Sequence, residues 1–183
     1  MAKVIVLNGT SSAGKSTLAK AVQLVAREPV LHVSMDDFLE MMPPRYANHE
    51  DAFLFKSVGT EAVPQTAIET GPYGARLVDG MRRAVAGLAD AGLDLIVDDV
   101  MLEKGDQAAY REALSGHELF FVGVKCSLDE AERRERARGD RSLGQARWQR
   151  ERVHRGVTYD LEIHTDAEPT DASAQKIVDA FSL

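Results

Sequence analysis

The sequence has little that would cross-link the chain or anchor it in a membrane. It contains one cysteine, Cys126, in 183 residues. An internal disulfide and a cysteine-based zinc cluster are therefore excluded, because each needs partner ligands. No apolar run approaches the roughly 18 residues of a membrane-spanning helix, and the apolar segment at residues 4–7 is too short for the core of a signal peptide. We expect a soluble, cytoplasmic protein without a membrane partner.

Positive charge is also scarce. The chain has 22 Lys and Arg against 29 Asp and Glu, which gives a formal net charge of −7. Proteins that bind nucleic acids need a basic surface to displace counterions, so we expect no nucleic-acid partner. One segment departs from the average, because residues 125–155 hold ten Lys and Arg against six Asp and Glu. An anionic ligand would have to be held by such a local feature.

The rest of the composition, 44% hydrophobic and 28% charged, is typical of a globular protein. At this length we expect one domain over residues 1–183. Apolar runs alternate with helical patterns, which predicts an α/β fold with a parallel sheet of about five strands flanked by helices. The predicted strands are residues 4–7, 30–33, 93–97, 119–124 and 159–163, and the predicted helices are residues 16–27, 75–91, 107–114, 128–138, 145–155 and 172–181. Prolines and glycines interrupt residues 43–74, which we expect to form an insertion with short helices at most.

The segment after the first predicted strand is the most informative. It reads Gly9-Thr10-Ser11-Ser12-Ala13-Gly14-Lys15-Ser16-Thr17 and matches the pattern of a phosphate-binding loop, or P-loop. The glycines let the backbone wrap around a phosphate, so that its N–H groups donate to the oxygens. Lys15 adds a positive charge for the β- and γ-phosphates, and Ser16 offers a hydroxyl to Mg²⁺. The pattern predicts that these nine residues bind a nucleoside triphosphate at the positive end of the next helix.

A second acidic motif follows the third predicted strand, which ends in Asp98 and Asp99. In such sheets ligands bind at the carboxyl ends of the strands, where a carboxylate can hold Mg²⁺ directly or through water. We favour Asp98 for the metal over Asp99. The alternative is that both residues only begin a loop.

ATP is the expected nucleotide, because the sequence lacks the Asn-Lys-x-Asp motif that reads guanine: its asparagines are Asn8 and Asn48. Asp36 follows the second predicted strand, where a carboxylate can accept the proton of an attacking hydroxyl. The alternative for Asp36 is a helix cap. We assign catalysis to Asp36 and the cap of a helix beginning at Phe38 to Asp37.

The end of the basic helix predicts a short lid at about residues 136–145, with a hinge at Gly139. Arginine suits a migrating phosphoryl group, because its guanidinium stays charged and forms paired bonds to the oxygens. We assign Arg138 and Arg141 to catalysis and Arg136 to nucleotide binding, with lid closure excluding water. The alternative is a solvated helix face on which arginines pair with glutamates, and we prefer it for Arg133 and Arg134.

These motifs together resemble the chloramphenicol phosphotransferase family, small P-loop kinases that modify an antibiotic hydroxyl. The resemblance extends nearly end to end. Its segments are residues 7–16, Asp36 with residues 40–43, residues 96–100, Ala137-Arg138-Gly139-Asp140-Arg141, and Val153-His154-Arg155-Gly156-Val157-Thr158-Tyr159-Asp160. In that family the carboxylate corresponding to Asp36 is taken as the base on the acceptor hydroxyl.

The resemblance implies an ATP- and Mg²⁺-dependent O-phosphotransferase that moves the γ-phosphoryl group to a small-molecule hydroxyl, with chloramphenicol or a related antibiotic as the first choice. Two departures leave the acceptor open: Asp37 stands where the family is expected to have a small hydroxyl residue, and the segment from Arg45 to Gly74 shows little resemblance. The alternatives are another metabolite or a nucleotide-sugar, as for zeta-type toxin kinases, or a non-catalytic ATP-binding regulator. Aromatic residues of the insertion can wall an acceptor pocket or simply pack the loop: they are Tyr46, Phe53, Phe55 and Tyr73. The oligomeric state stays open.

Overall fold

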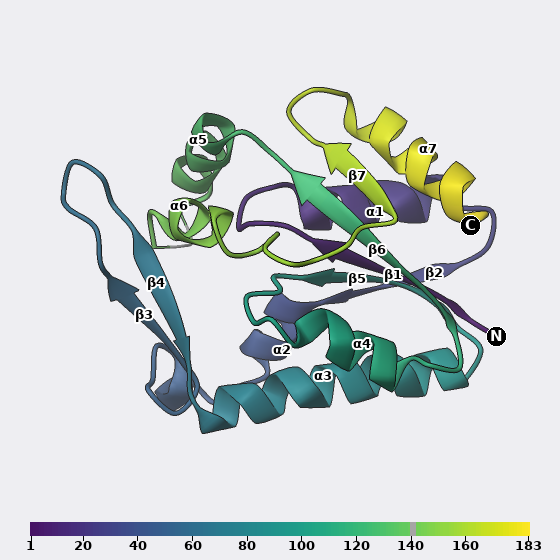
Figure 1. Cartoon of the computed structure of the whole chain (residues 1–183), viewed down its shortest axis with the longest axis horizontal. Coiled ribbons are helices and arrows are strands. Elements are labelled where there is room, and N and C mark those ends of the chain that lie inside the picture. Colours follow the sequence, from purple (N-terminus) through teal and green to yellow (C-terminus); the bar gives the residue numbers. More distant parts are fainter. Residues whose placement is uncertain (140–141) are drawn as a thin grey trace.

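A five-stranded parallel sheet forms the centre of the molecule in this computed structural model, which describes residues 1–139 and 142–183 (Figure 1). The strand order is β2-β5-β1-β6-β7. The strands are β1 (Lys3–Asn8), β2 (Val30–Ser34), β5 (Asp94–Asp99), β6 (Glu118–Lys125) and β7 (Leu161–His164). The predicted parallel sheet of about five strands is confirmed.

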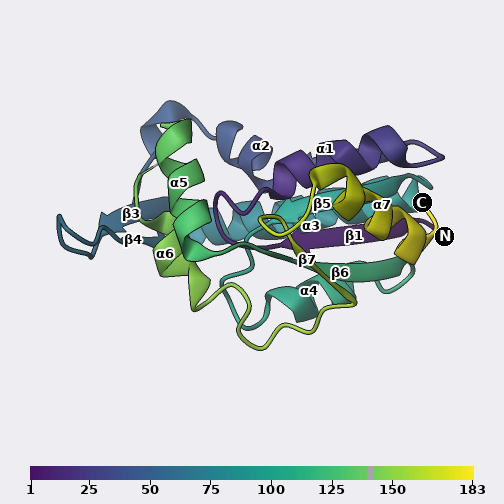
Figure 2. The same cartoon turned by 90° about the horizontal axis from the view of Figure 1, so that it is seen from above.

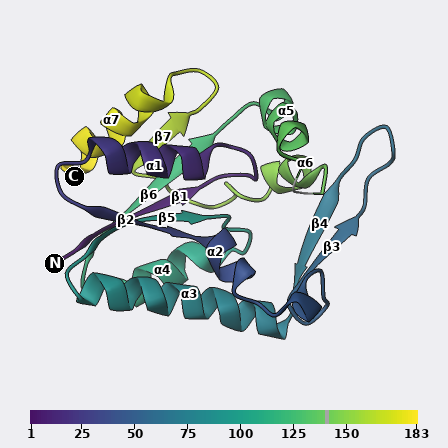
Figure 3. The same cartoon turned by 180° about the vertical axis from the view of Figure 1, so that it is seen from behind.

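Helices cover both faces of this sheet (Figure 3). Two of them, α1 (Lys15–Val25) and α7 (Thr170–Phe181), pack on one face, and α3 (Pro72–Asp90) and α4 (Asp106–Ala113) pack on the other. Strand β1 shows the alternation, since Ile5 and Leu7 belong to the first core and Val4 and Val6 to the second. A strand buried on both faces has an unbroken apolar sequence, which is why the four apolar residues 4–7 are readable as a strand.

The predicted insertion contains a β-hairpin, so the expectation of short helices at most was wrong. After a 3₁₀-helix at Pro44–Tyr46, β3 (Phe53–Ser57) pairs antiparallel with β4 (Thr66–Thr70) in a separate sheet. The strands are rich in aromatic and β-branched residues, which favour extended structure. Pro64 and Gly71 lie outside them. The hairpin stands apart from the main sheet, next to α5 (Leu128–Arg138) and α6 (Gln145–Arg150) (Figures 1 and 2).

The helix after β2 begins earlier than predicted. Helix α2 spans Met35–Glu40, and Ser34 is its cap, because the Ser34 hydroxyl accepts a hydrogen bond of 3.2 Å from the backbone N–H of Asp36. The assignment of the cap to Asp37 was therefore wrong. Serine is as good a cap as aspartate, and here it stands directly at the end of the strand. Asp36 and Asp37 both lie in the first turn of α2.

The sheet places three polar segments at one edge. Asp98 of β5 is paired in register with Leu7 of β1 and Ser34 of β2. The loop after β1, the start of α2 and the end of β5 therefore meet where parallel strands end, as expected for a ligand site. Among the described residues, no helix has the length and apolar character needed to span a membrane.

Candidate functional site

The loop between β1 and α1 has a backbone that other residues could not easily adopt. Gly14 has φ 95°, a left-handed conformation that favours glycine. A Cβ atom on Gly9 would lie 2.3 Å from the carbonyl oxygen of Val124 in β6. Gly9 is thus required by the close approach of a neighbouring strand as well as by the turn itself.

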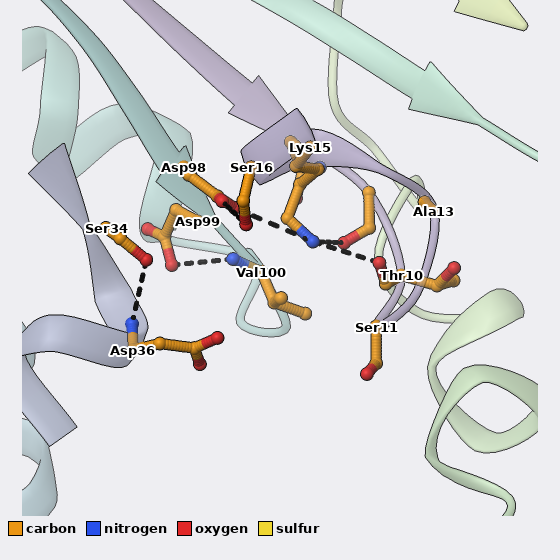
Figure 4. Close-up of polar contacts among 12 residues, drawn as sticks. Thr10, Ser11, Ala13, Lys15, Ser16, Ser34, Asp36, Asp98, Asp99 and Val100 are labelled. Carbon is orange, nitrogen blue, oxygen red and sulfur yellow. Dashed lines mark hydrogen bonds and ion pairs between the residues drawn. The ribbon is translucent and has the colours of Figure 1, made fainter. Parts of the chain in front are cut away.

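Lys15 and Ser16 join this loop to β5 (Figure 4). The Lys15 Nζ donates to the carbonyl oxygens of Gly9 and Thr10, both at 2.9 Å, and lies 3.8 Å from Asp98 Oδ1. Ser16 Oγ donates to Asp98 Oδ2 at 2.5 Å. Burial alone would raise the pKa of Asp98, but the positive charge of Lys15, the His32 side chain 3.8 Å away and the Ser16 hydrogen bond hold this pKa below its usual value. Asp98 is therefore an ionised carboxylate at neutral pH.

Its neighbour Asp99 has a different environment. Asp99 Oδ2 accepts from the Tyr110 hydroxyl at 2.8 Å, and Oδ1 accepts from the N–H of Val100 at 2.7 Å. Burial raises the pKa of Asp99 and, well above its ordinary value, that of Tyr110. Of the two carboxylates, Asp98 contacts the P-loop and Asp99 contacts the packed helix α4.

A cavity of about 620 Å³ extends from the P-loop to the β3–β4 hairpin. The sequence-predicted residues that it brings together are Ser11, Ser12, Gly14, Lys15, Ser16, Thr17, Asp36, Asp98 and Arg138. The other loop residues, Gly9, Thr10 and Ala13, do not line it. In Figure 4 the Asp36 carboxylate points away from α2 into the space between Val100 and Ser11. One open space thus contacts both the P-loop and the carboxylate after β2.

The arginines of α5 divide by helical face. Arg134 and Arg138 are four residues apart and both line the cavity. Arg136 is not among the lining residues: its mostly exposed side chain lies 3.9 Å from Glu132. The structure therefore does not bring Arg136 to the site, because it is half a turn away from the cavity face. Arg141 lies outside the described residues.

The structure adds two side chains to the site. Arg134 was expected only to pair with a glutamate on a solvated helix face; it does pair with Glu130 at 2.8 Å, but it also contacts the P-loop. Gln149 was not singled out from the sequence. Arg134 donates to the carbonyl oxygen of Ala13 at 3.3 Å and to both oxygens of Thr165 at 3.0 and 3.1 Å, so it joins the P-loop to the segment after β7. Gln149 Oε1 accepts from the Ser11 N–H at 2.5 Å. The spacing of Arg134 and Arg138 was a signal for the first residue. Nothing in the sequence pattern marks Gln149.

The hairpin supplies an apolar wall. Phe53, Phe55 and Ile68 line the cavity, as does Leu39 of α2. Tyr46 and Tyr73 do not line it but stack on each other, with ring centroids 5.0 Å apart. Half of the aromatic set expected from the sequence therefore faces the cavity.

The fold and this arrangement define a P-loop kinase. The APS kinase of Mycobacterium tuberculosis, solved with AMPPNP and APS, superposes with a TM-score of 0.68 at 18% identity, covering 100% of this chain and 98% of that one. A gluconokinase from Sinorhizobium meliloti 1021 has a TM-score of 0.63 at 16% identity, covering 98% and 91%. A tunicamycin resistance protein of Deinococcus radiodurans has a TM-score of 0.67 at 15% identity, covering 100% and 97%. At these identities the likeness is one of fold.

The sequence gives the narrower assignment. The family described as chloramphenicol phosphotransferase-like protein matches residues 2–182. Two curated relatives with the provisional name O-phosphotransferase, from Mycobacterium tuberculosis strains CDC 1551 and H37Rv, are each 30% identical over 184 residues, covering 98% of this chain and 82% of the relative. The chain belongs to the chloramphenicol phosphotransferase-like family, which confirms the resemblance and the phosphotransferase class.

Proposed function

We propose that the protein is an ATP- and Mg²⁺-dependent O-phosphotransferase that transfers the γ-phosphoryl group to the hydroxyl of a small molecule, with chloramphenicol or a related antibiotic as the first candidate. The observation that carries the proposal is the single cavity that contacts the P-loop, Asp36 and the apolar hairpin wall. Phosphoryl transfer depends on holding donor and acceptor in line. One open space with a phosphate loop at one end and a carboxylate in the middle meets that need.

The P-loop fits a triphosphate. The hydroxyl oxygens of Ser11 and Ser12 are buried without a hydrogen-bond partner among the described residues, and an unsatisfied buried hydroxyl is costly unless a ligand meets it. The N-terminus of α1 adds its positive end at the same place. A second cavity of about 210 Å³ lies beside Gly14, Thr17 and Arg134, and we assign it to the nucleoside part.

The residues present also fit Mg²⁺. This ion prefers oxygen ligands, keeps several waters, and is commonly held by one or two carboxylates together with substrate phosphates. Ser16 Oγ and the ionised Asp98 are adjacent and supply one hydroxyl and one carboxylate oxygen. When bound there, the metal would neutralise charge on the phosphates and orient them.

The transfer step then uses four side chains. Asp36 accepts the proton of the acceptor hydroxyl while the new oxygen–phosphorus bond forms and the bond from the γ-phosphorus to the bridging oxygen breaks, leaving ADP. Lys15 and Arg138 stabilise the charge on the migrating group. Arg141, which belongs to the predicted lid, is assigned the same role. Leu39, Phe53 and Phe55 pack against the body of the acceptor, which favours one with an aromatic or other apolar part.

The test is turnover of chloramphenicol with Mg-ATP, followed by mass spectrometry for a phosphorylated product. Asp36→Asn should lower kcat by about a hundredfold or more, the usual contribution of a general base, while the Kd of ATP changes by less than about threefold. Asp37→Asn is the matched control and should keep activity. Transfer that is unaffected by Asp36→Asn overturns the assignment of the base. Failure of every tested alcohol to be phosphorylated, with ATP bound, overturns the proposed activity.

A further inference from the structure

Charge is unevenly distributed along the main cavity. The end formed by the P-loop and α5 is lined by four cations, Lys15, Arg133, Arg134 and Arg138, together with the Asp98 carboxylate. The end formed by α3 and the loop after β5 is lined by acidic side chains, with one described cation among them. The acidic residues there are Asp99, Glu103 and Asp106, and the cation is Arg82. The two ends are therefore suited to ligands of opposite charge.

Arg82 adds no net positive charge to the end of the cavity formed by α3 and the loop after β5. Its Nη2 donates to Asp106 Oδ1 at 2.6 Å, and the two side chains are 12% and 14% exposed. The guanidinium also lies over the Tyr110 ring, 5.1 Å from the centroid. A partly buried pair of this geometry keeps its partners together, so Asp106 neutralises the charge of Arg82, while Arg82 Nε is buried without a hydrogen-bond partner among the described residues.

Glu103 is left as an acidic group at the mouth of the cavity. The other oxygen of Asp106 accepts from the Glu103 N–H at 2.9 Å, which holds the backbone of this loop in place. The Glu103 side chain is exposed, lines the cavity, and makes no ion pair with any residue in 1–139 or 142–183. Asp99, in contrast, is already engaged by Tyr110 and Val100.

This charge pattern disfavours an acceptor that already bears phosphate. A phosphate monoester carries about −1.5 to −2 charges near neutral pH, and at this end it would meet the Glu103 carboxylate and an arginine whose charge Asp106 already neutralises. Resting on the proposed phosphotransferase function, we propose that the acceptor is an apolar alcohol bearing a positively charged amino group, which Glu103 binds while the hairpin wall packs against its apolar part. Glu103 is then a specificity residue of the acceptor site.

The experiment uses three compounds with one skeleton and different charge. They are chloramphenicol, which is an uncharged amide; the amino diol obtained by removing its acyl group, which is cationic; and the N-succinyl derivative of that amine, which is anionic. Binding of each is measured by calorimetry with Mg²⁺ and a non-hydrolysable ATP analogue. Phosphoryl transfer to each is measured separately with Mg-ATP, so that acceptor recognition and turnover are read independently.

The amine should bind most tightly and the carboxylate most weakly. Glu103→Gln should raise the Kd of the amine about threefold more than that of the amide, because an exposed ion pair contributes roughly 0.2–1 kcal/mol. The preference should shrink in about 1 M salt, where the Debye length falls to about 3 Å. Glu112→Gln, the same change at an exposed position on α4 away from the cavity, is the matched control and should leave the order unchanged.

Two results overturn the inference: tighter binding of the amide or the carboxylate than of the amine, or an equal effect of Glu103→Gln on amine and amide. Either can occur while chloramphenicol is phosphorylated, in which case the proposed function stands. Conversely, Glu103-dependent binding of the amine without phosphoryl transfer to any compound supports the acceptor class and contradicts the proposed function.

Discussion

The side chain of Gln149 accepts a hydrogen bond of 2.5 Å from the backbone N–H of Ser11. Gln149 is 2% exposed and lies at the end of α6, whereas Ser11 is in the middle of the P-loop. P-loops use their N–H groups to bind phosphate oxygens. A phosphate that binds to the Ser11 N–H must therefore compete with the Gln149 carbonyl oxygen, which links nucleotide binding to α6.

This competition predicts an unusual response to Gln149→Ala. Without ligand, the free energy of unfolding of the variant should be lower by about 1–2 kcal/mol, because the buried N–H of Ser11 loses its partner. The melting temperature should fall by roughly 2–6 °C. With Mg-ATP the deficit should become smaller, since a phosphate oxygen then accepts from Ser11. Thermal unfolding with and without Mg-ATP measures the difference.

The control for this prediction is Gln107→Ala. Gln107 also bonds to backbone, donating to the Thr158 carbonyl oxygen at 2.7 Å, but it lies away from the cavity. Gln107→Ala should lower the melting temperature by a similar or smaller amount without changing the shift in melting temperature that ATP induces. An equal ATP-induced shift in wild type and Gln149→Ala would contradict the competition.

The pair Ser16–Asp98 leads to a prediction about metal dependence. Asp98→Asn removes the negative charge that Mg²⁺ would need, so the Mg²⁺ concentration that gives half-maximal ATP binding should rise about tenfold or more. Asp94→Asn changes the same residue type at the opposite end of β5, where Asp94 accepts from the Lys3 N–H, and should leave the Mg²⁺ requirement unchanged. Titration of Mg²⁺ at a fixed ATP concentration measures this. An unchanged Mg²⁺ requirement in Asp98→Asn would show that the metal binds elsewhere.

Arg134 should matter far more than the adjacent Arg133. Arg134 bonds to Ala13 and Thr165 in two other segments, whereas Arg133 is 65% exposed and pairs with Glu130 on its own helix. We expect Arg134→Ala to lower the free energy of unfolding by about 2 kcal/mol and Arg133→Ala, at an exposed position, to leave it nearly unchanged. Urea denaturation measures both free energies of unfolding, and equal losses in the two variants would contradict the proposal that Arg134 links the P-loop to the segment after β7.

The main sheet and the P-loop were readable from sequence because each depends on local patterns. Strands buried on both faces are short apolar runs, as at residues 4–7, and the loop requires specific residue types at fixed spacing. Asp98 could be placed beside Ser16 because parallel strands bring their carboxyl ends to one edge. These parts of the fold and site follow from periodicity and topology.

The errors have tertiary causes. The hairpin was missed because its second strand lies between Pro64 and Gly71, which from sequence read as interruptions of a longer element rather than as its ends. The start of α2 was misplaced because Ser34 belongs to both the strand and the cap. Gln149 could not be predicted, since its partner is a backbone N–H that only the folded chain brings near.

Gly144 predicts a strong effect of a small substitution. It has φ 87°, and a Cβ atom there would lie 2.3 Å from the carbonyl oxygen of Pro64, in the loop that joins β3 to β4. Gly144→Ala should therefore lower the free energy of unfolding by about 1 kcal/mol through backbone strain and by an additional roughly 1–3 kcal/mol through the steric clash. Gly92, with φ 85° and no atom within 4 Å of a Cβ, is the matched control for strain alone. Equal melting temperatures of the two alanine variants would show that the hairpin moves away from the new Cβ atom at no measurable cost in stability.

His154 predicts that acid weakens the fold. Its Nδ1 lies 2.7 Å from the Tyr159 hydroxyl, and burial, followed by repulsion from Lys125, holds the pKa of His154 below its ordinary value of 6.5. Burial also raises the pKa of Tyr159 to about 12, so the tyrosine stays protonated throughout the range in which His154 titrates.

Because the folded state has the lower pKa, the unfolded chain takes up the proton first as the pH falls below about 6.5, and the free energy of unfolding decreases until the folded pKa is passed. Between about pH 7.5 and about pH 5.5 the melting temperature of His154→Gln should thus fall by roughly 1–3 °C less than that of the wild type. His164→Gln, at an exposed position of β7, should keep the wild-type pH dependence. If His154→Gln and wild type lose the same stability over this interval, His154 does not carry the acid sensitivity, and titration of other groups must explain any loss.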